Sequence, residues 1–256
     1  MKPPKSIYIT DDLEAIRAQT RDYVEREIVP RAEAWESEGV PREVLDDMGR
    51  LGFFGLRVPE EYGGIGMGAL ASVLFAEELG RSTYGGFSIT VLVHTDLATP
   101  YVLRFGTEDQ KARWLPAMAS GELITAIGVT EPDAGSDVAA MRTTARREGE
   151  GFVLNGTKMF ITNGGIADLV FIAAKTSADV KGSRGISIFA VEKDTPGFTA
   201  SRALQKMGWH SSNTAELILE DVRVPEGNLI GEENQGFYHI MANFQNERLA
   251  IMGQAL

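Results

Sequence analysis

The sequence predicts an α+β protein of several domains, and two observations predict it. Apolar residues recur at helical spacing in the first half, and short β-branched or alternating segments bounded by Gly, Pro, Asn or Asp begin near Leu123. A helical pattern returns from Asn234 onward. We therefore expect an N-terminal all-α domain at 1–122, a middle antiparallel β-barrel or sandwich at 123–232, and the first helix of a C-terminal helical bundle at 233–256, with the remainder of that bundle absent.

The first helix has recognisable start and stop signals. Thr10, followed by two aspartates, is typical of a helix N-cap, and Pro30 bends or interrupts the helix because proline lacks a backbone N–H. The apolar positions at helical spacing are Leu13, Ile16, Val24 and Ile28.

The remaining helices of the first half are delimited in the same way. A short helix is expected at about Arg42–Leu51, and the glycine-rich loop EYGGIGMG precedes another that ends near Gly80. The apolar stretch from about Phe87 to Phe105 is helix-like. Thr107 and Gln110 form a capping-box pattern that opens the next helix.

The middle third contains the predicted strands. The run EGEG at Glu148–Gly151 is a candidate hairpin turn. The strand-like segments are ITAIGV, TTARREGEGFVLNG, LVFIAAK, ISIFAVE and AELILEDVRVP.

Composition excludes several classes of function. The chain has no cysteine, which excludes disulfides and thiolate chemistry, and its three histidines are too widely spaced for a zinc or di-iron centre, so we expect no metal. A formal net charge of -11 disfavours nucleic-acid binding. No apolar run is long enough for a membrane span, and the N-terminal residues lack the apolar core of a secretory signal. The expected location is the cytoplasm.

The stretch Val129–Asp137, VTEPDAGSD, is the first candidate ligand site. Thr130 offers a hydroxyl, Gly135 allows close approach of the backbone, and Ser136 with neighbouring N–H groups can bind phosphate oxygens. A polar turn at the end of a strand, formed by Asp133 and Ser136, explains the same residues equally well.

The stretch Asn155–Gly165, NGTKMFITNGG, is the second candidate. Phe160 and Thr162 flank a strand end, where an aromatic ring and a hydroxyl can contact a planar ligand. On pattern alone, a core phenylalanine and a strand threonine are the commoner explanation.

The final helix carries the third candidate. Ile240, Phe244, Glu247 and Ile251 share one helical face, and Glu247 interrupts its apolar character. A carboxylate in such a position is costly unless it is paired or functional. The alternative is a glutamate at the helix edge that reaches solvent.

Together and in this order, these stretches resemble the acyl-CoA dehydrogenase family over nearly the whole chain. The matching blocks are EYGGIGMG, FAEELGRS, ITAIGVTEPDAGSDVAAMRTTA, FVLNGTKMFITNGGIADLVFIAAKT and KMGWHSSNTAELILEDVRVPEGNLIGEENQGFYHIM. The resemblance implies helical, β and helical domains, with FAD between the last two. It also implies oxidation of acyl-CoA thioesters to trans-2-enoyl-CoA in fatty-acid β-oxidation, electron transfer to electron-transfer flavoprotein, and a homotetramer or homodimer.

The resemblance assigns roles to the first two candidate segments. Thr130 would bind the pyrimidine side of the flavin, Phe160 would pack on the ring, and Thr162 would lie near the reactive nitrogen. Gly135 and Ser136 would lie near the pyrophosphate, with Ser136 also at the thioester entrance. The full set of implied cofactor-binding residues is Ile127, Gly128, Val129, Thr130, Gly135, Ser136, Phe160, Ile161 and Thr162.

The resemblance also implies a catalytic base. Short- and medium-chain members place it in the distal C-terminal bundle, whereas long-chain and isovaleryl-CoA types place it in a Glu-Arg-Leu motif after the β-domain. The latter pattern is matched here at Glu247, which would remove the α proton of the substrate. The implied substrate-binding residues are Ser136, Gln245, Asn246, Glu247 and Arg248.

Several alternatives stay open from the sequence. An acyl-CoA oxidase shares this chemistry but passes its electrons to oxygen, and a catalytically silent flavin-binding or assembly module shares the fold. The resemblance implies that helices around Ala71–Gly80 and Val91–Tyr101 set the depth of the acyl pocket. Without the rest of the bundle, we expect Phe237, Met241 and Phe244 to be unburied.

Overall fold

A computed structural model describes residues 7–177 and 182–256, so part of the N-terminal segment assessed above for a signal lies outside it. Within those two ranges, none of the helices has the length and apolarity needed to cross a membrane. The helices of the first half are α1 (Asp11–Tyr23), η1 (Val24–Ile28), α2 (Ala32–Glu38), α3 (Arg42–Arg50), η2 (Phe53–Gly55), η3 (Glu60–Tyr62), α4 (Ala69–Gly80), α5 (Gly85–Leu92), η4 (Val93–Ala98), α6 (Thr99–Phe105) and α7 (Glu108–Ser120).

Local capping signals begin two of these helices where the sequence predicts. The Thr10 hydroxyl accepts a hydrogen bond from the backbone N–H of Leu13 at 3.3 Å. At α7 both halves of the capping box form: the Thr107 hydroxyl accepts from Gln110 N, and the Gln110 side chain accepts from Thr107 N. These bonds satisfy N–H groups that a helix start leaves free.

A rare π-helical segment interrupts the apolar run between α5 and α6. The run is helical throughout, as predicted, but η4 adopts the wider π turn at Val93–Ala98. His94 anchors this segment, since its ring contacts the Thr125 hydroxyl at 2.8 Å and the Met118 carbonyl at 3.0 Å. Burial lowers the pKa of His94 to about 4, so the ring is neutral at physiological pH. The histidine therefore fixes η4 against strand β1 (Thr125–Gly128) and helix α7.

The second half folds into one eight-stranded sheet whose strands have the order β6-β7-β3-β2-β4-β5-β8, with β1 beside β4. Most pairs are antiparallel, and β2 and β3 meet at the predicted turn with Glu148 opposite Gly151. β4 is an exception because both β1 and β2 pair with it in parallel. The strands are β1 (Thr125–Gly128), β2 (Thr144–Glu148), β3 (Gly151–Thr162), β4 (Leu169–Lys175), β5 (Ile186–Glu192), β6 (Phe198–Ala200), β7 (Thr214–Pro225) and β8 (Leu229–Ile230).

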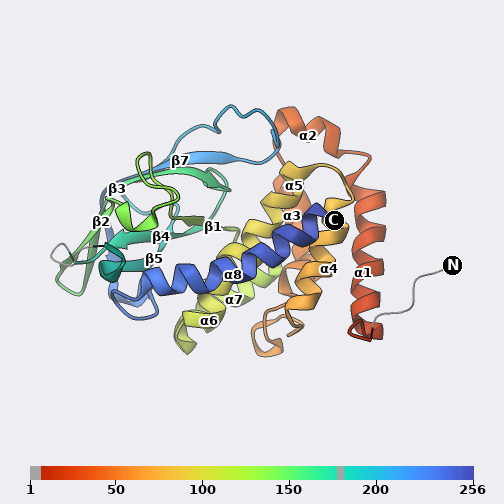
Figure 1. Cartoon of the computed structure of the whole chain (residues 1–256), viewed down its shortest axis with the longest axis horizontal. Coiled ribbons are helices and arrows are strands. Elements are labelled where there is room, and N and C mark those ends of the chain that lie inside the picture. The colour runs from red at the N-terminus through yellow and green to blue at the C-terminus, as the bar shows by residue number, and fades with distance from the viewer. Residues whose placement is uncertain (1–6, 178–181) are drawn as a thin grey trace.

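One apolar core joins the sheet to the helices. Tyr101 of α6, Trp114 of α7 and Phe171 of β4 belong to this cluster, and all are essentially buried. Two further clusters fill the helical half and the opposite face of the sheet. The strands therefore lie on one side of the molecule and the helices on the other, with shared apolar contacts between them (Figure 1).

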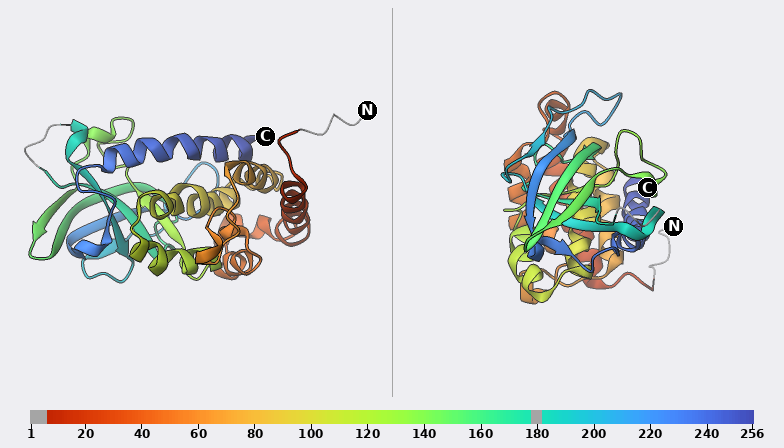
Figure 2. Two further views of the ribbon diagram at one scale, coloured as in Figure 1. Left: turned by 90° about the horizontal axis from the view of Figure 1, so that it is seen from below. Right: turned by 90° about the vertical axis from the view of Figure 1, so that its left-hand side faces the viewer.

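Helix α8 (Gly236–Ala255) crosses from the sheet side to the helical side of the molecule (Figures 1 and 2). The prediction that Phe237, Met241 and Phe244 are unburied was wrong. These three residues are partly buried against the shared core, whereas Ile251, further along the helix, is exposed. The covered face includes Ile240, which is fully buried, because the first turns of α8 lie over the sheet and α6.

The C-terminal half of α8 packs differently, because it lies against α4. Ala250 and Gly253 are buried there, and a Cβ on Gly253 would approach the Val73 carbonyl oxygen to 2.6 Å. Small residues therefore permit close packing of the two helices. The large apolar side chains that α8 leaves exposed are Tyr238 near its start and Leu249, Ile251 and Met252 in its C-terminal half.

Candidate active site

A hollow of about 220 Å³ lies where η4, the end of β1, the end of β3 and α8 meet. These four segments are far apart in the sequence and are brought together by the sheet and by α8. The lining residues are Val93, Leu97, Ile127, Val129, Thr130, Phe160, Ile161, Thr162, Phe244 and Glu247. The hollow thus contains one carboxylate, two hydroxyl-bearing side chains and otherwise apolar walls.

The segment that carries Thr130 is fastened to β3. Met159 N donates to the Thr130 carbonyl at 2.9 Å, and the backbones of Glu131 and Ala134 exchange hydrogen bonds at 2.8 and 3.2 Å. Lys158, on the same strand, donates from Nζ to Glu131 Oε1 at 2.7 Å and to the Val129 carbonyl at 3.3 Å. The lysine therefore holds residues on both sides of Thr130.

The Lys158–Glu131 ion pair is buried, because the lysine side chain is 0% exposed and the glutamate side chain 5%. Burial lowers the pKa of Lys158 to about 8, although the carboxylate opposes this shift. Burial alone would raise the pKa of Glu131, but Lys158 and the N–H groups of Arg142 and Thr143 hold it below its ordinary value. The pair therefore keeps its charges through mutual contact and backbone donors.

Phe160 reaches the hollow through an irregularity in β3. The pairing of β3 with β7 shifts register between Lys158 and Ile161, as in a β-bulge. Phe160 has a φ of 61°, which is unusual for a bulky residue, and its side chain is 66% exposed. Bulges and left-handed residues of this kind often aim a side chain into a functional site.

The backbone after Thr162 is also held firmly. Asn163 is fully buried and has a φ of 64°. Its backbone N–H donates to the Asn213 carbonyl at 2.6 Å, and its side chain donates to the Thr90 carbonyl at 2.8 Å. Within the described residues, the hydroxyls of Thr130 and Thr162 have no hydrogen-bond partner. Two positioned hydroxyls are thus available to a ligand in the hollow.

Glu247 is half-buried and lines the hollow from α8. Burial raises the pKa of its carboxyl above the ordinary 4.5, while the neighbouring Arg248 opposes the shift. Its position is therefore not that of a helix-edge glutamate directed wholly into water. A carboxylate with raised pKa beside apolar walls has the properties of a general base.

Not every residue proposed from the sequence lies at the hollow. Gly128 is buried beneath it, where a Cβ would approach Ile172 Cδ1 to 2.7 Å, and Gly135 and Ser136 are exposed on the turn beyond Glu131. Gln245, Asn246 and Arg248 are on α8 but are not among the lining residues.

Sequence reasoning missed Lys158 and Glu131 altogether. A lysine inside a strand, with an acid in the adjacent motif, is the signal that could have identified the pair. Val93 and Leu97 fall within the longer Val91–Tyr101 stretch, but the sequence did not indicate which of its residues would line the hollow.

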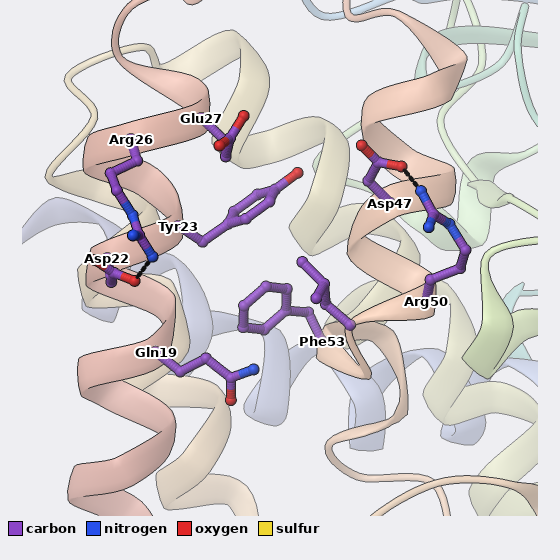
Figure 3. A pocket seen from close by; sticks show the side chains of 9 residues that line it. Gln19, Asp22, Tyr23, Arg26, Glu27, Asp47, Arg50 and Phe53 are labelled. Atoms are coloured by element: carbon purple, nitrogen blue, oxygen red, sulfur yellow. Dashed lines mark hydrogen bonds and ion pairs between the residues drawn. The ribbon is translucent and has the colours of Figure 1, made fainter.

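A larger hollow of about 480 Å³ lies between α1 and α3, with Tyr23 and Phe53 among its lining residues (Figure 3). Ion pairs of Arg26 with Asp22 and of Arg50 with Asp47 lie on its two sides. Its acids are charged partners of arginines on exposed helix surfaces. It therefore offers no sheltered base comparable to Glu247.

Comparison with known proteins defines the class to which this fold belongs. Residues 10–122 match the acyl-CoA dehydrogenase N-terminal domain, and residues 126–222 match the acyl-CoA dehydrogenase middle domain. The chain belongs to the acyl-CoA dehydrogenase family, whose members bind FAD.

Individual relatives agree with this assignment. An acyl-CoA dehydrogenase of Bacillus subtilis is 41% identical over 251 residues, which are 98% of this chain and 66% of the relative. The mitochondrial long-chain specific acyl-CoA dehydrogenase of Mus musculus is 42% identical over 244 residues, 94% of this chain and 56% of the relative. The chain therefore spans somewhat more than half to two thirds of the length of these curated relatives.

Solved structures show the same fold. The acyl-CoA dehydrogenase of Geobacillus kaustophilus superposes with a TM-score of 0.93 at 44% identity, covering 98% of this chain and 66% of that one. A glutaryl-CoA dehydrogenase from Mycobacterium smegmatis in complex with FADH2 gives a TM-score of 0.88 at 37% identity, covering 96% and 62%.

Breaking the buried ion pair is expected to destabilise the protein. Lys158→Met removes the cation but leaves the Glu131 carboxylate buried, and such changes cost about 3–5 kcal/mol. The free energy of unfolding in urea measures the loss. The matched control is the double variant Lys158→Met/Glu131→Gln, which should recover part of it because no unpaired charge stays inside. A single variant as stable as the wild type would contradict the role given to the pair.

Proposed function

We propose that this protein catalyses FAD-dependent α,β-dehydrogenation of acyl-CoA thioesters, giving trans-2-enoyl-CoA. The observation that carries the proposal is the half-buried carboxylate of Glu247 in the hollow between the Thr130 and Thr162 segments. Because the chain covers about two thirds or less of its relatives' length, activity, substrate and partner are all parts of the proposal. We further propose three units, at 1–122, 123–232 and 233–256, and assembly as a homodimer or homotetramer.

The residues at the hollow fit a flavin ring. Phe160 offers an exposed aromatic face, and the free hydroxyls of Thr130 and Thr162 can bond to polar atoms on a ring edge. Ile127, Val129 and Ile161 supply the apolar walls that a planar ring requires. Gly128, buried below, leaves room for this packing, and Gly135 and Ser136 would contact the more distant pyrophosphate. When bound, FAD would supply the electron sink that accepts a hydride from the substrate's β carbon.

Glu247 would act on the α carbon. Its carboxylate oxygen would accept the α proton, and partial removal from water makes it a stronger base than an exposed glutamate. Val93, Leu97 and Phe244 would limit the access of water to that carboxylate. In this proposal Ser136, Gln245, Asn246 and Arg248 contact the thioester from positions outside the described hollow.

Replacement of the base should separate flavin binding from chemistry. Glu247→Gln is expected to keep bound FAD but to lose flavin bleaching when an acyl-CoA thioester is added, because the amide cannot accept the α proton. Absorbance near the flavin maximum, titrated with a panel of acyl-CoA thioesters, provides the measurement. Bleaching at the wild-type rate would assign the base to another residue.

The pH dependence of bleaching should report the ionisation of Glu247. Only the ionised carboxylate can accept a proton, so the rate should rise with pH, with a midpoint above the ordinary value of 4.5. Arg248→Gln removes the charge that lowers this pKa and should shift the midpoint to higher pH. Stopped-flow measurements from pH 5 upward test both statements. A downward shift in Arg248→Gln would oppose the electrostatic account.

The electron acceptor is tested by reoxidation of the bleached protein. We expect slow reoxidation in air and rapid reoxidation by electron-transfer flavoprotein, as for a dehydrogenase. Fast reoxidation by oxygen alone would assign the protein to the acyl-CoA oxidases instead. A protein that binds no FAD would favour the assembly module.

A further inference from the structure

We propose that Asn243 is a positioning residue for Glu247, because its side-chain amide ties α8 to the Leu97 carbonyl and so holds the Glu247 carboxylate over the hollow. This inference rests on the role proposed for Glu247 and adds the device that fixes its location. The device consists of one hydrogen bond between two walls of the hollow.

A single hydrogen bond connects the two walls of the hollow that α8 and η4 form. Asn243 Nδ2 donates to the Leu97 carbonyl oxygen at 2.7 Å, and Leu97 itself lines the hollow. Asn243 lies four residues before Glu247 on α8, so the two side chains project from the same face one turn apart. A displacement of α8 relative to η4 at Asn243 would therefore move the carboxylate by a similar amount.

Asparagine is an unexpected residue at this position unless its amide has a specific role. The residue is 1% exposed, in a stretch of α8 where Ile240 and Phe244 pack against the core. Burial of an amide is costly unless it forms hydrogen bonds, and an apolar side chain would avoid that cost. The orientation of the amide is also determined: Nδ2 must face Leu97, since Oδ1 in its place would oppose a second acceptor.

The buried side chain of a tyrosine lies next to Asn243. Tyr101 of α6 is fully buried beside the Asn243 side chain, and neither its hydroxyl nor Asn243 Oδ1 meets the geometry of a full hydrogen bond within the described ranges. Burial raises the pKa of Tyr101 far above its ordinary value, the Glu247 carboxylate raises it further, and the Asn243 side chain opposes both. Tyr101, Asn243 and Glu247 therefore lie close enough to influence one another. Among the described residues, the titratable groups that act on the Glu247 carboxylate are Arg248 and Tyr101.

The acceptor of the bond lies in the π-helical segment η4. π-helical turns are rare and occur frequently at functional sites. The hydroxyl of Thr99, the first residue of α6, also donates to the His94 carbonyl at 2.7 Å, so a second carbonyl of η4 accepts a side-chain hydrogen bond. His94 in turn fixes η4 to β1 and α7. Asn243 therefore connects α8 to a wall that is itself firmly held.

The decisive experiment measures the ionisation of Glu247 without flavin or substrate. Carboxyl carbons of glutamate are labelled with ¹³C, Glu247→Gln identifies the resonance, and the titration is recorded for the wild type and for Asn243→Leu. We expect the raised pKa of the wild type to fall toward 4.5 in Asn243→Leu, because α8 is released and the carboxylate reaches water. An unchanged titration would overturn the proposal.

The control separates the hydrogen bond from general packing. Ile240→Val removes buried volume on α8, one turn earlier, and leaves the bond to Leu97 intact. It should titrate like the wild type, and an equal shift in both variants would assign the effect to loosened packing and refute the tether. Asn243→Ser, whose side chain is too short to reach Leu97, replaces Asn243→Leu if the latter fails to fold and is expected to shift the same way.

Bleaching kinetics provide a second readout. In the flavin-loaded protein, Asn243→Leu should slow bleaching about 10- to 100-fold, the effect expected of a displaced catalytic group, with little change in the acyl-CoA concentration for half-maximal rate. A weakened affinity at an unchanged rate would contradict a positioning role. A wild-type protein that never bleaches would refute the proposed function, and the titration would still decide whether Asn243 holds Glu247.

Discussion

The ion pair between Lys158 and Glu131 is the interaction on which the candidate site most depends. It connects the strand that ends at Phe160 and Thr162 to the turn that follows Thr130, and both groups are shielded from water. A buried pair of this kind is a poor source of stability compared with apolar packing, but its geometry is demanding. The pair contributes specificity, because it sets the spacing of the two segments that line the hollow.

Helix α8 completes the hollow from the other side. It lies across the boundary between sheet and helices, with Ile240 in the shared core and Ala250 against the helical half. This placement leaves Glu247 between water and the apolar interior, where burial raises its pKa without a buried cationic partner. The Glu247 carboxylate, the hydroxyls of Thr130 and Thr162 and the aromatic ring of Phe160 consequently line one hollow although they come from distant parts of the sequence.

Features determined by neighbouring residues could be predicted from the sequence. The caps at Thr10 and Thr107 and the hairpin turn at Glu148–Gly151 depend on contacts within a few positions. The spacing of apolar residues predicted the order of helices and strands, and the family resemblance implied the same order. Candidate residues such as Thr130 and Glu247 came from motifs matched in the same way. Their convergence on one hollow is a property of the folded chain.

Features that depend on contacts between residues distant in the sequence could not be predicted from the sequence pattern. The partner of Lys158 lies 27 residues away, and the bulge at Phe160 has no compositional signal. The π turn of η4 likewise resembles an ordinary apolar helix. The partial burial of Phe237, Met241 and Phe244 was misjudged because helical spacing identifies a face but does not reveal what covers it.

The location of the flavin is the most direct test of the whole account. A crystal structure of the FAD-loaded protein should place the isoalloxazine ring in the hollow beside Thr130 and Thr162, with the Glu247 carboxylate facing it. A ring bound elsewhere, for example in the larger hollow between α1 and α3, would contradict it.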